Sequence, residues 1–153
     1  MDISFQTPQG RFNLRVCAVI VHDGRLLTMR DGICDYAYLP GGRVQLHETA
    51  EQAILRELWE EMHLEARILR PLWLCQSFFT EETYGERYHE LCLYFEVALP
   101  DVQSDFCFVE GGRTNRFEWV PFRDLQHRHL YPEFIKDRIF HLPEQLELLV
   151  ENS

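Results

Sequence analysis

The sequence predicts one α/β domain that covers residues 1–153. Apolar runs that fit strands alternate with stretches that carry a helical pattern, which is typical of an α/β fold. The chain of 153 residues is long enough to bury one substantial core, and 46% of its residues are hydrophobic. No repeat, low-complexity tract or linker divides it.

The first predicted unit is a β-hairpin. Residues Val16–Val21 form a continuous apolar run, and Leu26–Met29 follow after a short polar segment. Asp23-Gly24 between two apolar runs is a strong hairpin signal, because both residue types accept the positive φ of a tight turn.

A segment with two glycines is predicted next. Residues 31–35 are expected to form a loop, and residues 36–39 an extended stretch that leads into Pro40-Gly41-Gly42. Glycine has no side chain, so the backbone can approach a ligand closely. We therefore expect a turn here that lines a binding site.

The clearest predicted helix follows this turn. Thr49 and Gln52 match a capping box, in which each side chain bonds the backbone of the other residue. Apolar residues at helical spacing predict a buried stripe of Leu55, Leu58, Trp59 and Met62. The glutamates of this helix are expected on a wet face, centred about 140° around the axis from the stripe.

The next predicted elements are strands. Residues 66–80 and 90–99 have the composition of strands, and the polar segment 81–89 between them is expected to be a loop. A longer connection at 100–115 leads to a short strand at 116–120.

Two further helices are expected near the C-terminus. One covers residues 131–142, where Pro132 is acceptable in a first helical turn, and a short one covers 145–150. The final segment is expected to pack against the domain or a second subunit.

Three glutamates of the first helix point to a metal site. Glu57, Glu60 and Glu61 stand at i, i+3 and i+4 and share one helical face. Without a cation they repel by about a few tenths of a kcal/mol per pair. A solvated face is the ordinary explanation for such a cluster. A solvated face becomes a minor alternative, because the glycine pair, Glu48 and Arg56 all stand at fixed spacings from these glutamates.

Residues 42–64 resemble the Nudix box, G-x5-E-x7-R-E-U-x-E-E-x-G-U, where U is an aliphatic residue. The matching positions are Gly42, Glu48, Arg56, Glu57, Leu58, Glu60, Glu61 and Leu64. His63 stands where the family has glycine. That glycine is expected to end the helix with a positive φ, which histidine tolerates better than most side chains.

The resemblance implies a Nudix-type α/β/α sandwich around a mixed β-sheet, and a hydrolase that uses Mg²⁺, with Mn²⁺ as a substitute. The metal ligands it implies are Glu57, Glu60, Glu61, the backbone carbonyl of Gly41 and, in some members, Glu48. Glu57 would also help to activate water, with Arg56 orienting it through a charge-assisted hydrogen bond.

Family members often bring one more acid from a late loop. Glu110, beside Gly111-Gly112, is the candidate for that catalytic role, and Glu118 is the alternative. For each of them, an ordinary surface charge is an equally good explanation.

Candidate substrate contacts lie outside the box. Arg43 follows the glycine pair and is placed to meet phosphate oxygens. Tyr84, Arg87 and Tyr88 belong to the predicted loop 81–89, where they can stack on a base or bind a phosphate. A solvent loop with packed aromatic side chains is the more ordinary explanation.

Charge and cysteine content limit the partners and the compartment. The formal net charge of −10 disfavours direct binding of nucleic acid or of an anionic membrane. Five cysteines without C-x-x-C spacing suit free thiols in a reducing cytoplasm, and Cys17, Cys75 and Cys92 are expected in the core. No signal-like N-terminus and no apolar run near the roughly 20 residues of a membrane span is present.

The resemblance implies cleavage of the pyrophosphate linkage in a small-molecule nucleoside diphosphate derivative. A nucleoside triphosphate, a nucleotide sugar such as ADP-ribose, and a dinucleoside polyphosphate are all candidates, and a homodimer is left open. One alternative is a non-catalytic module that binds a nucleotide and regulates a partner, although such modules usually lose box carboxylates. Another is an isomerase of diphosphate esters, which needs an acid or thiol outside the box.

Overall fold

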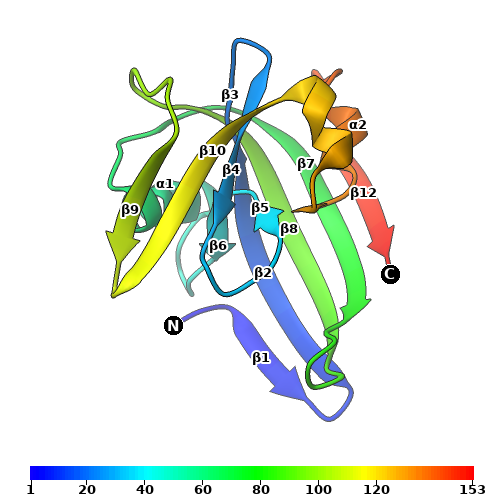
Figure 1. The fold of residues 1–153 in the computed structure, drawn as a ribbon. Coiled ribbons are helices and arrows are strands. Elements are labelled where there is room, and N and C mark those ends of the chain that lie inside the picture. Colours follow the sequence, from blue (N-terminus) through cyan, green and yellow to red (C-terminus); the bar gives the residue numbers. More distant parts are fainter.

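Two mixed β-sheets form most of the computed structural model, which describes residues 1–153 (Figure 1). The first sheet has the strand order β1 (Ser4–Thr7), β2 (Gly10–Val19), β8 (Arg87–Ala98), β7 (Arg67–Thr80) and β12 (Glu147–Asn152). A short strand, β6 (Gly41–Arg43), also pairs with β2. The β2–β8 and β7–β12 pairs are parallel and the other pairs are antiparallel.

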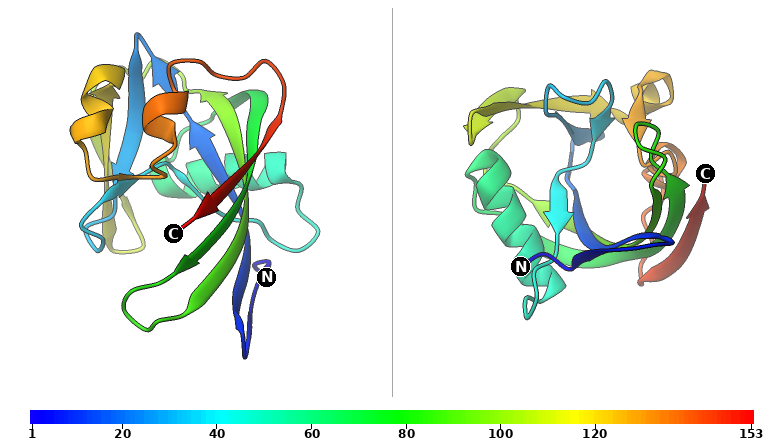
Figure 2. Two further views of the ribbon diagram at one scale, coloured as in Figure 1. Left: turned by 90° about the vertical axis from the view of Figure 1, so that its right-hand side faces the viewer. Right: turned by 90° about the horizontal axis from the view of Figure 1, so that it is seen from below.

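The second sheet has the order β11 (Leu130–Tyr131), β5 (Ala37–Tyr38), β4 (Arg25–Arg30), β10 (Arg113–Pro121) and β9 (Phe106–Glu110). Strand β3 (Val21–His22) pairs with β4. Helix α1 (Ala50–Met62) lies on one side of the sheets, and the 3-10 helix η1 (Phe122–His127) and α2 (Ile135–Arg138) lie on the other (Figure 2). The predicted α/β fold is confirmed, although two mixed sheets are present where the prediction had one mixed sheet.

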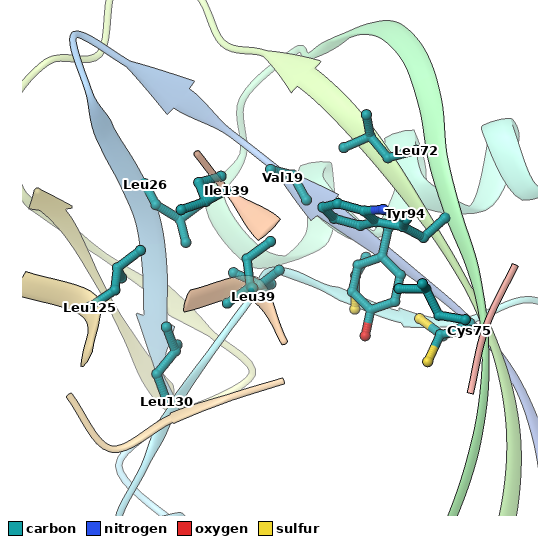
Figure 3. Packing of buried hydrophobic residues seen from close by; sticks show 14 of the residues in the cluster. Val19, Leu26, Leu39, Leu72, Cys75, Tyr94, Leu125, Leu130 and Ile139 are labelled. Atoms are coloured by element: carbon teal, nitrogen blue, oxygen red, sulfur yellow. The ribbon is translucent and has the colours of Figure 1, made fainter. Parts of the chain in front are cut away.

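The core consists of two apolar clusters on opposite faces of β2. Its even-numbered residues, such as Val16 and Ala18, join the cluster beneath α1. Cys17 and Val19 face the other cluster, which packs against η1 and α2 and contains Cys75 and Tyr94 (Figure 3). This alternation follows from the two-residue period of a strand. The predicted core positions of the three cysteines are confirmed, and their thiols are free.

The predicted β3–β4 hairpin is confirmed. His22 pairs with Arg25, and the two residues between them have positive φ values, 50° at Asp23 and 70° at Gly24. Both central residues of a type I′ turn require this backbone conformation, and Asp-Gly adopts it at little cost.

The segment Gly41-Gly42 is a strand rather than the predicted turn. It forms β6 and pairs antiparallel with β2, with Gly42 opposite Val16. A Cβ atom on Gly41 would overlap the carbonyl oxygen of Val16. Gly41 is therefore required because two backbones approach each other closely, and not because the chain turns there.

Helix α1 begins and ends as predicted. The Thr49 side chain accepts from the Gln52 N–H, and the Gln52 side chain accepts from the Thr49 N–H, which completes the capping box. His63 ends the helix in the left-handed region with φ of 56°, as expected for the position where the family has glycine. Its ring lies 3.8 Å from that of Trp59 and 5.6 Å from that of Phe108, centroid to centroid.

The predicted buried stripe of α1 is wrong in phase. Leu58 and Met62 are buried, but Leu55 is 39% exposed and Trp59 is 44% exposed. The stripe that packs consists of Ala53, Ile54, Leu58, Glu61 and Met62. Leu58 and Met62 belong to two overlapping sets of apolar positions on the helix. The prediction chose the set that contains Leu55 and Trp59 because their side chains are larger. As a consequence, Glu61 is in the interior and not on the wet face.

Strand β8 begins earlier than predicted. It pairs with β7 from Arg87 onward, so the connecting loop covers only residues 81–86, and both Arg87 and Tyr88 are strand residues. The Tyr88 ring stacks on Phe79 at 4.9 Å with an interplanar angle of 3°. Polar residues alternate with aromatic ones in this stretch, which suits the exposed end of a strand as well as a loop.

The connection predicted at 100–115 contains strand β9, which forms a hairpin with β10 through Gly111 and Gly112. The strand predicted at 116–120 is confirmed as part of β10.

The two helices predicted near the C-terminus are largely wrong. Only Ile135–Arg138 is helical within 131–142, and residues 147–152 form strand β12. Main-chain pairing with β7 and burial of Leu149 override a local pattern too short to distinguish helix from strand. No helix of the structure is long and apolar enough to cross a membrane.

Candidate functional site

Arg56 on α1 is the centre of a network of charge-assisted hydrogen bonds. Its guanidinium donates to both carboxylate oxygens of Glu48, at 2.7 and 3.0 Å. It also donates to Glu57 at 3.0 Å and to Glu60 at 3.2 Å. A further bond of 3.0 Å reaches the carbonyl of Arg43 in β6. One arginine thus connects the helix, the segment before it and the glycine strand.

Glu48 anchors this network. Its carboxylate also accepts from the Gln45 N–H at 2.9 Å, and the hydrogen bonds from Arg56 lower the pKa of Glu48 below its usual range. Because both of its oxygens accept from Arg56, Glu48 mainly holds that arginine in place.

Glu57 packs directly under the glycine strand. A Cβ atom on Gly42 would overlap the Glu57 carboxylate, so only glycine leaves room for that group. Burial raises the pKa of Glu57, while Arg56 opposes the shift and Arg15 opposes it more weakly. The sequence prediction placed Gly42 and Glu57 in one motif, and the structure brings them into contact.

Glu61 is the most buried acid of the cluster, with 6% of its surface exposed. Its carboxylate accepts from the Gly41 N–H at 2.9 Å. Burial, and after it the charge of Glu57, raise the pKa of Glu61 well above its usual range. Glu60, which directly precedes Glu61, is 45% exposed and is bound only by Arg56.

Asn115 links the late acid Glu110 to this cluster. Its Nδ2 donates to the backbone carbonyl of Glu61 and to the carboxylate of Glu110, both at 3.1 Å. The charge of Glu110 also contributes to the raised pKa of Glu61. Sequence reasoning missed Asn115, since its only signal is an inward strand position in a hairpin that was not predicted.

Glu118 has different partners. Arg128 donates to both of its carboxylate oxygens, at 2.9 and 3.0 Å. Of the two late acids, Glu110 is therefore the one that is connected to α1, through Asn115 and the backbone carbonyl of Glu61.

The predicted substrate residues separate into two places. Arg43 adjoins the cluster, and its guanidinium has one long ion pair with Asp2 at 3.9 Å. Tyr84 is 90% exposed in the loop at the far end of the β7–β8 hairpin, and the neighbouring Tyr88 pairs with Arg11 of β2. The structure therefore does not bring Tyr84, Arg87 and Tyr88 to the carboxylates.

The donor set near α1 fits a hard divalent cation. It consists of carboxylate oxygens. Burial is the main reason that the pKa values of Glu57 and Glu61 are raised, and the charge of Glu60 adds to the shift of Glu57 and that of Glu57 to the shift of Glu61. No group of three or more His, Cys, Asp or Glu side chains is arranged so that it could hold a metal ion by itself. Mg²⁺ does not require one, since it usually binds through one or two carboxylates together with waters and substrate phosphates.

Comparison with known proteins extends the sequence resemblance. The family model described as NUDIX domain matches residues 11–140. A curated relative from Mycobacterium tuberculosis (strain CDC 1551 / Oshkosh), named putative mutator protein MutT4, is 32% identical over 96 residues, which are 62% of this chain. The chain spans only 36% and 37% of the lengths of the two curated relatives that it matches.

Solved structures share the fold. The crystal structure of a UDP-X diphosphatase matches 94% of this chain and 68% of its own, with a TM-score of 0.64 and 23% identity. A mutator MutT protein from Bacillus halodurans matches 92% of this chain and 90% of its own, with a TM-score of 0.64 and 14% identity.

Proposed function

The chain belongs to the Nudix family, and from this premise we propose that it is a hydrolase that cleaves a pyrophosphate linkage in a nucleoside diphosphate derivative. The observation that carries the proposal is the pair of carboxylates on Glu57, partly buried, and Glu61, buried, which pack against the backbone of Gly41 and Gly42. Burying two like charges side by side is costly unless a cation or a proton compensates them.

Glu57, Glu60, Glu61 and the carbonyl of Gly41 are the residues that would hold Mg²⁺, or Mn²⁺ in its place. The ion would supply positive charge to the phosphate oxygens and make the attacking water more acidic. Mg²⁺ suits this set because every donor is an oxygen.

The remaining residues orient and accept protons. Arg56 orients the Glu57 carboxylate through its 3.0 Å hydrogen bond, and Glu57, itself a proposed metal ligand, would also help to activate the water. Glu48 keeps Arg56 in position. Glu110, held by Asn115, is the candidate for the additional acid, and Arg43 is a candidate phosphate contact.

The substrate class has three members: a nucleoside triphosphate, a nucleotide sugar such as ADP-ribose, and a dinucleoside polyphosphate. Among the structures that share the fold, a UDP-X diphosphatase and an ADP-ribose pyrophosphatase have names that fit the nucleotide-sugar class. The partner is a small molecule, and the net charge of −10 disfavours nucleic acid. Free thiols in the core suit a reducing compartment such as the cytoplasm.

The decisive experiment measures Mg²⁺-dependent product release from these three substrate classes, with Glu57→Gln as the test variant. Glu51→Gln is the matched control, because Glu51 is exposed in the first turn of the same helix and contacts none of the site residues. We expect turnover of one class by the wild type and by Glu51→Gln, and a loss of about a hundredfold or more in Glu57→Gln.

Other outcomes separate the alternatives. Nucleotide binding without turnover by the folded wild type would favour the non-catalytic module. A product with the mass of the substrate would favour an isomerase. Wild-type rates in Glu57→Gln would remove the assigned role of this carboxylate.

A further inference from the structure

Arg15 of β2 is a cation without an acceptor beside the candidate site. Its guanidinium makes no hydrogen bond, and no carboxylate oxygen lies within 4.0 Å of it. The residue is partly buried and keeps some exposed surface. An arginine carries a fork of N–H donors and no acceptor, and such a fork in a partly enclosed position is normally paired.

Arg11 on the same strand shows the contrast. Both arginines are odd-numbered residues of β2 and therefore project from the same face. Arg11 forms an ion pair of 2.8 Å with Glu86, and it also donates to Ser4 and Gln6, at 3.0 and 3.3 Å. The sheet thus supplies acceptors for one arginine and none for the other.

The acidic groups near Arg15 are Cys17, Glu90, Cys92 and Tyr94, and none of them forms a hydrogen bond with it. The pKa of the Cys17 thiol is lowered, chiefly by its hydrogen bond with Cys92 and further by the charge of Arg15. Glu90 is the acid on the same face, and it already accepts from Asn13 at 2.9 Å. Burial raises the pKa of both Cys92 and Tyr94 well above their usual ranges, so these side chains stay neutral. Arg15 itself keeps its charge at every accessible pH.

Arg15 also lies close to the carboxylate cluster. It pairs in register with Arg43 of β6, the strand that contains Gly41 and Gly42. Its positive charge is near enough to Glu57 to lower the pKa of that carboxyl. Residues paired in register project from the same face, so Arg43 projects with Arg15 away from α1, while the Arg43 carbonyl accepts from Arg56 of that helix.

We propose that Arg15 binds a phosphate of the substrate, on the face of β2 that points away from α1. This inference rests on the proposed function and adds to it a named anion subsite that is separate from the metal ligands. The planar guanidinium can donate two parallel hydrogen bonds to one phosphate. The subsite would hold the phosphate chain next to the proposed metal ligands, and Arg43 would provide the second cation.

The test uses inorganic pyrophosphate as the probe and isothermal titration calorimetry in EDTA, so that no metal takes part. We expect the wild type and Arg11→Gln to bind with similar Kd. Arg15→Gln should raise Kd by about tenfold or more, because charge-assisted hydrogen bonds are lost. Arg15→Lys keeps the charge without the fork and should fall between them. Equal binding by wild type and Arg15→Gln, or no binding by either, would overturn the proposal.

Steady-state kinetics on the full chain provide the second readout. Arg15→Gln should raise KM more than it lowers kcat, in contrast to Glu57→Gln, which should lower kcat. If pyrophosphate binding depends on Arg15 but no nucleotide is hydrolysed, the subsite stands and the proposed hydrolase fails. If nucleotides are hydrolysed and Arg15→Gln matches the wild type in both measurements, only the subsite fails. Circular dichroism of each variant checks that it is folded.

Discussion

At the scale of single residues, the site depends on buried charge. Glu61 is buried, and its pKa is raised by that burial and by the charge of Glu57. Its carboxylate accepts a hydrogen bond from the Gly41 N–H. The raised pKa means that the folded state binds the proton of Glu61 more tightly than the unfolded state does. This carboxyl therefore contributes stability below its unfolded pKa, and that stability is lost as the pH rises through the folded pKa.

Glu61→Gln should consequently stabilise the metal-free protein at pH 8 and change it much less at pH 5. Glutamine has a similar shape, stays neutral and can still accept from Gly41. Thermal unfolding in EDTA at the two pH values measures the effect as a difference in Tm between variant and wild type. The same Tm difference at both pH values would show that the charge of Glu61 is not the cause.

Sequence reasoning identified most residues of the site but not their surroundings. The register of Gly42, Glu48, Arg56 and the glutamates can be read from spacing alone, because a helix turns that spacing into geometry. The burial of Glu61 cannot be read in this way, since it depends on which of two overlapping stripes packs against the sheets. The partner of Asn115 on α1 is distant in the sequence, and Arg15 has no partner. Sequence spacing gives no information about the role of either residue.

At the scale of elements, the phase of α1 distinguishes core from surface. Leu58→Ala should lower the free energy of unfolding by about 2–5 kcal/mol, because Leu58 is fully buried in the cluster beneath the helix. Leu55→Ala is the matched control on the same helix. Leu55 is largely exposed, so its replacement should change the stability by no more than about 0.5 kcal/mol. Urea denaturation of both variants measures this, and equal losses would mean that the helix is rotated from the phase described.

Elements with a clear local signal were predicted well. The Asp-Gly hairpin and the capping box each depend on two residues whose conformations are nearly independent of the rest of the chain. Strand β12 was mistaken for a helix because its pairing partner, β7, lies about seventy residues earlier in the sequence. Strand β6 was mistaken for a turn because glycine pairs are commoner in turns than in strands.

At the scale of the whole molecule, metal binding should be linked to the stability of the fold. Mg²⁺ bound by carboxylates of the folded state alone would stabilise it by about 2.7 kcal/mol at a concentration one hundred times its Kd. We expect Mg²⁺ to raise the Tm of the wild type and of Glu51→Gln, and to raise that of Glu57→Gln much less. The comparison is made by thermal unfolding at fixed ionic strength, with NaCl replacing MgCl₂. An equal rise in all three proteins would point to non-specific screening.

His63 implies a constraint on how this sequence diverged from relatives that have glycine at the same position. Its ring stands between Trp59 of α1 and Phe108 of β9, the strand that ends in Glu110. A glycine at this position carries no ring, so it could not make the contacts with Trp59 and Phe108. Substitutions at the three aromatic positions should therefore have been accepted together during divergence. Glycine placed at position 63 of this chain alone would restore the family pattern and still leave the helix end without its aromatic support.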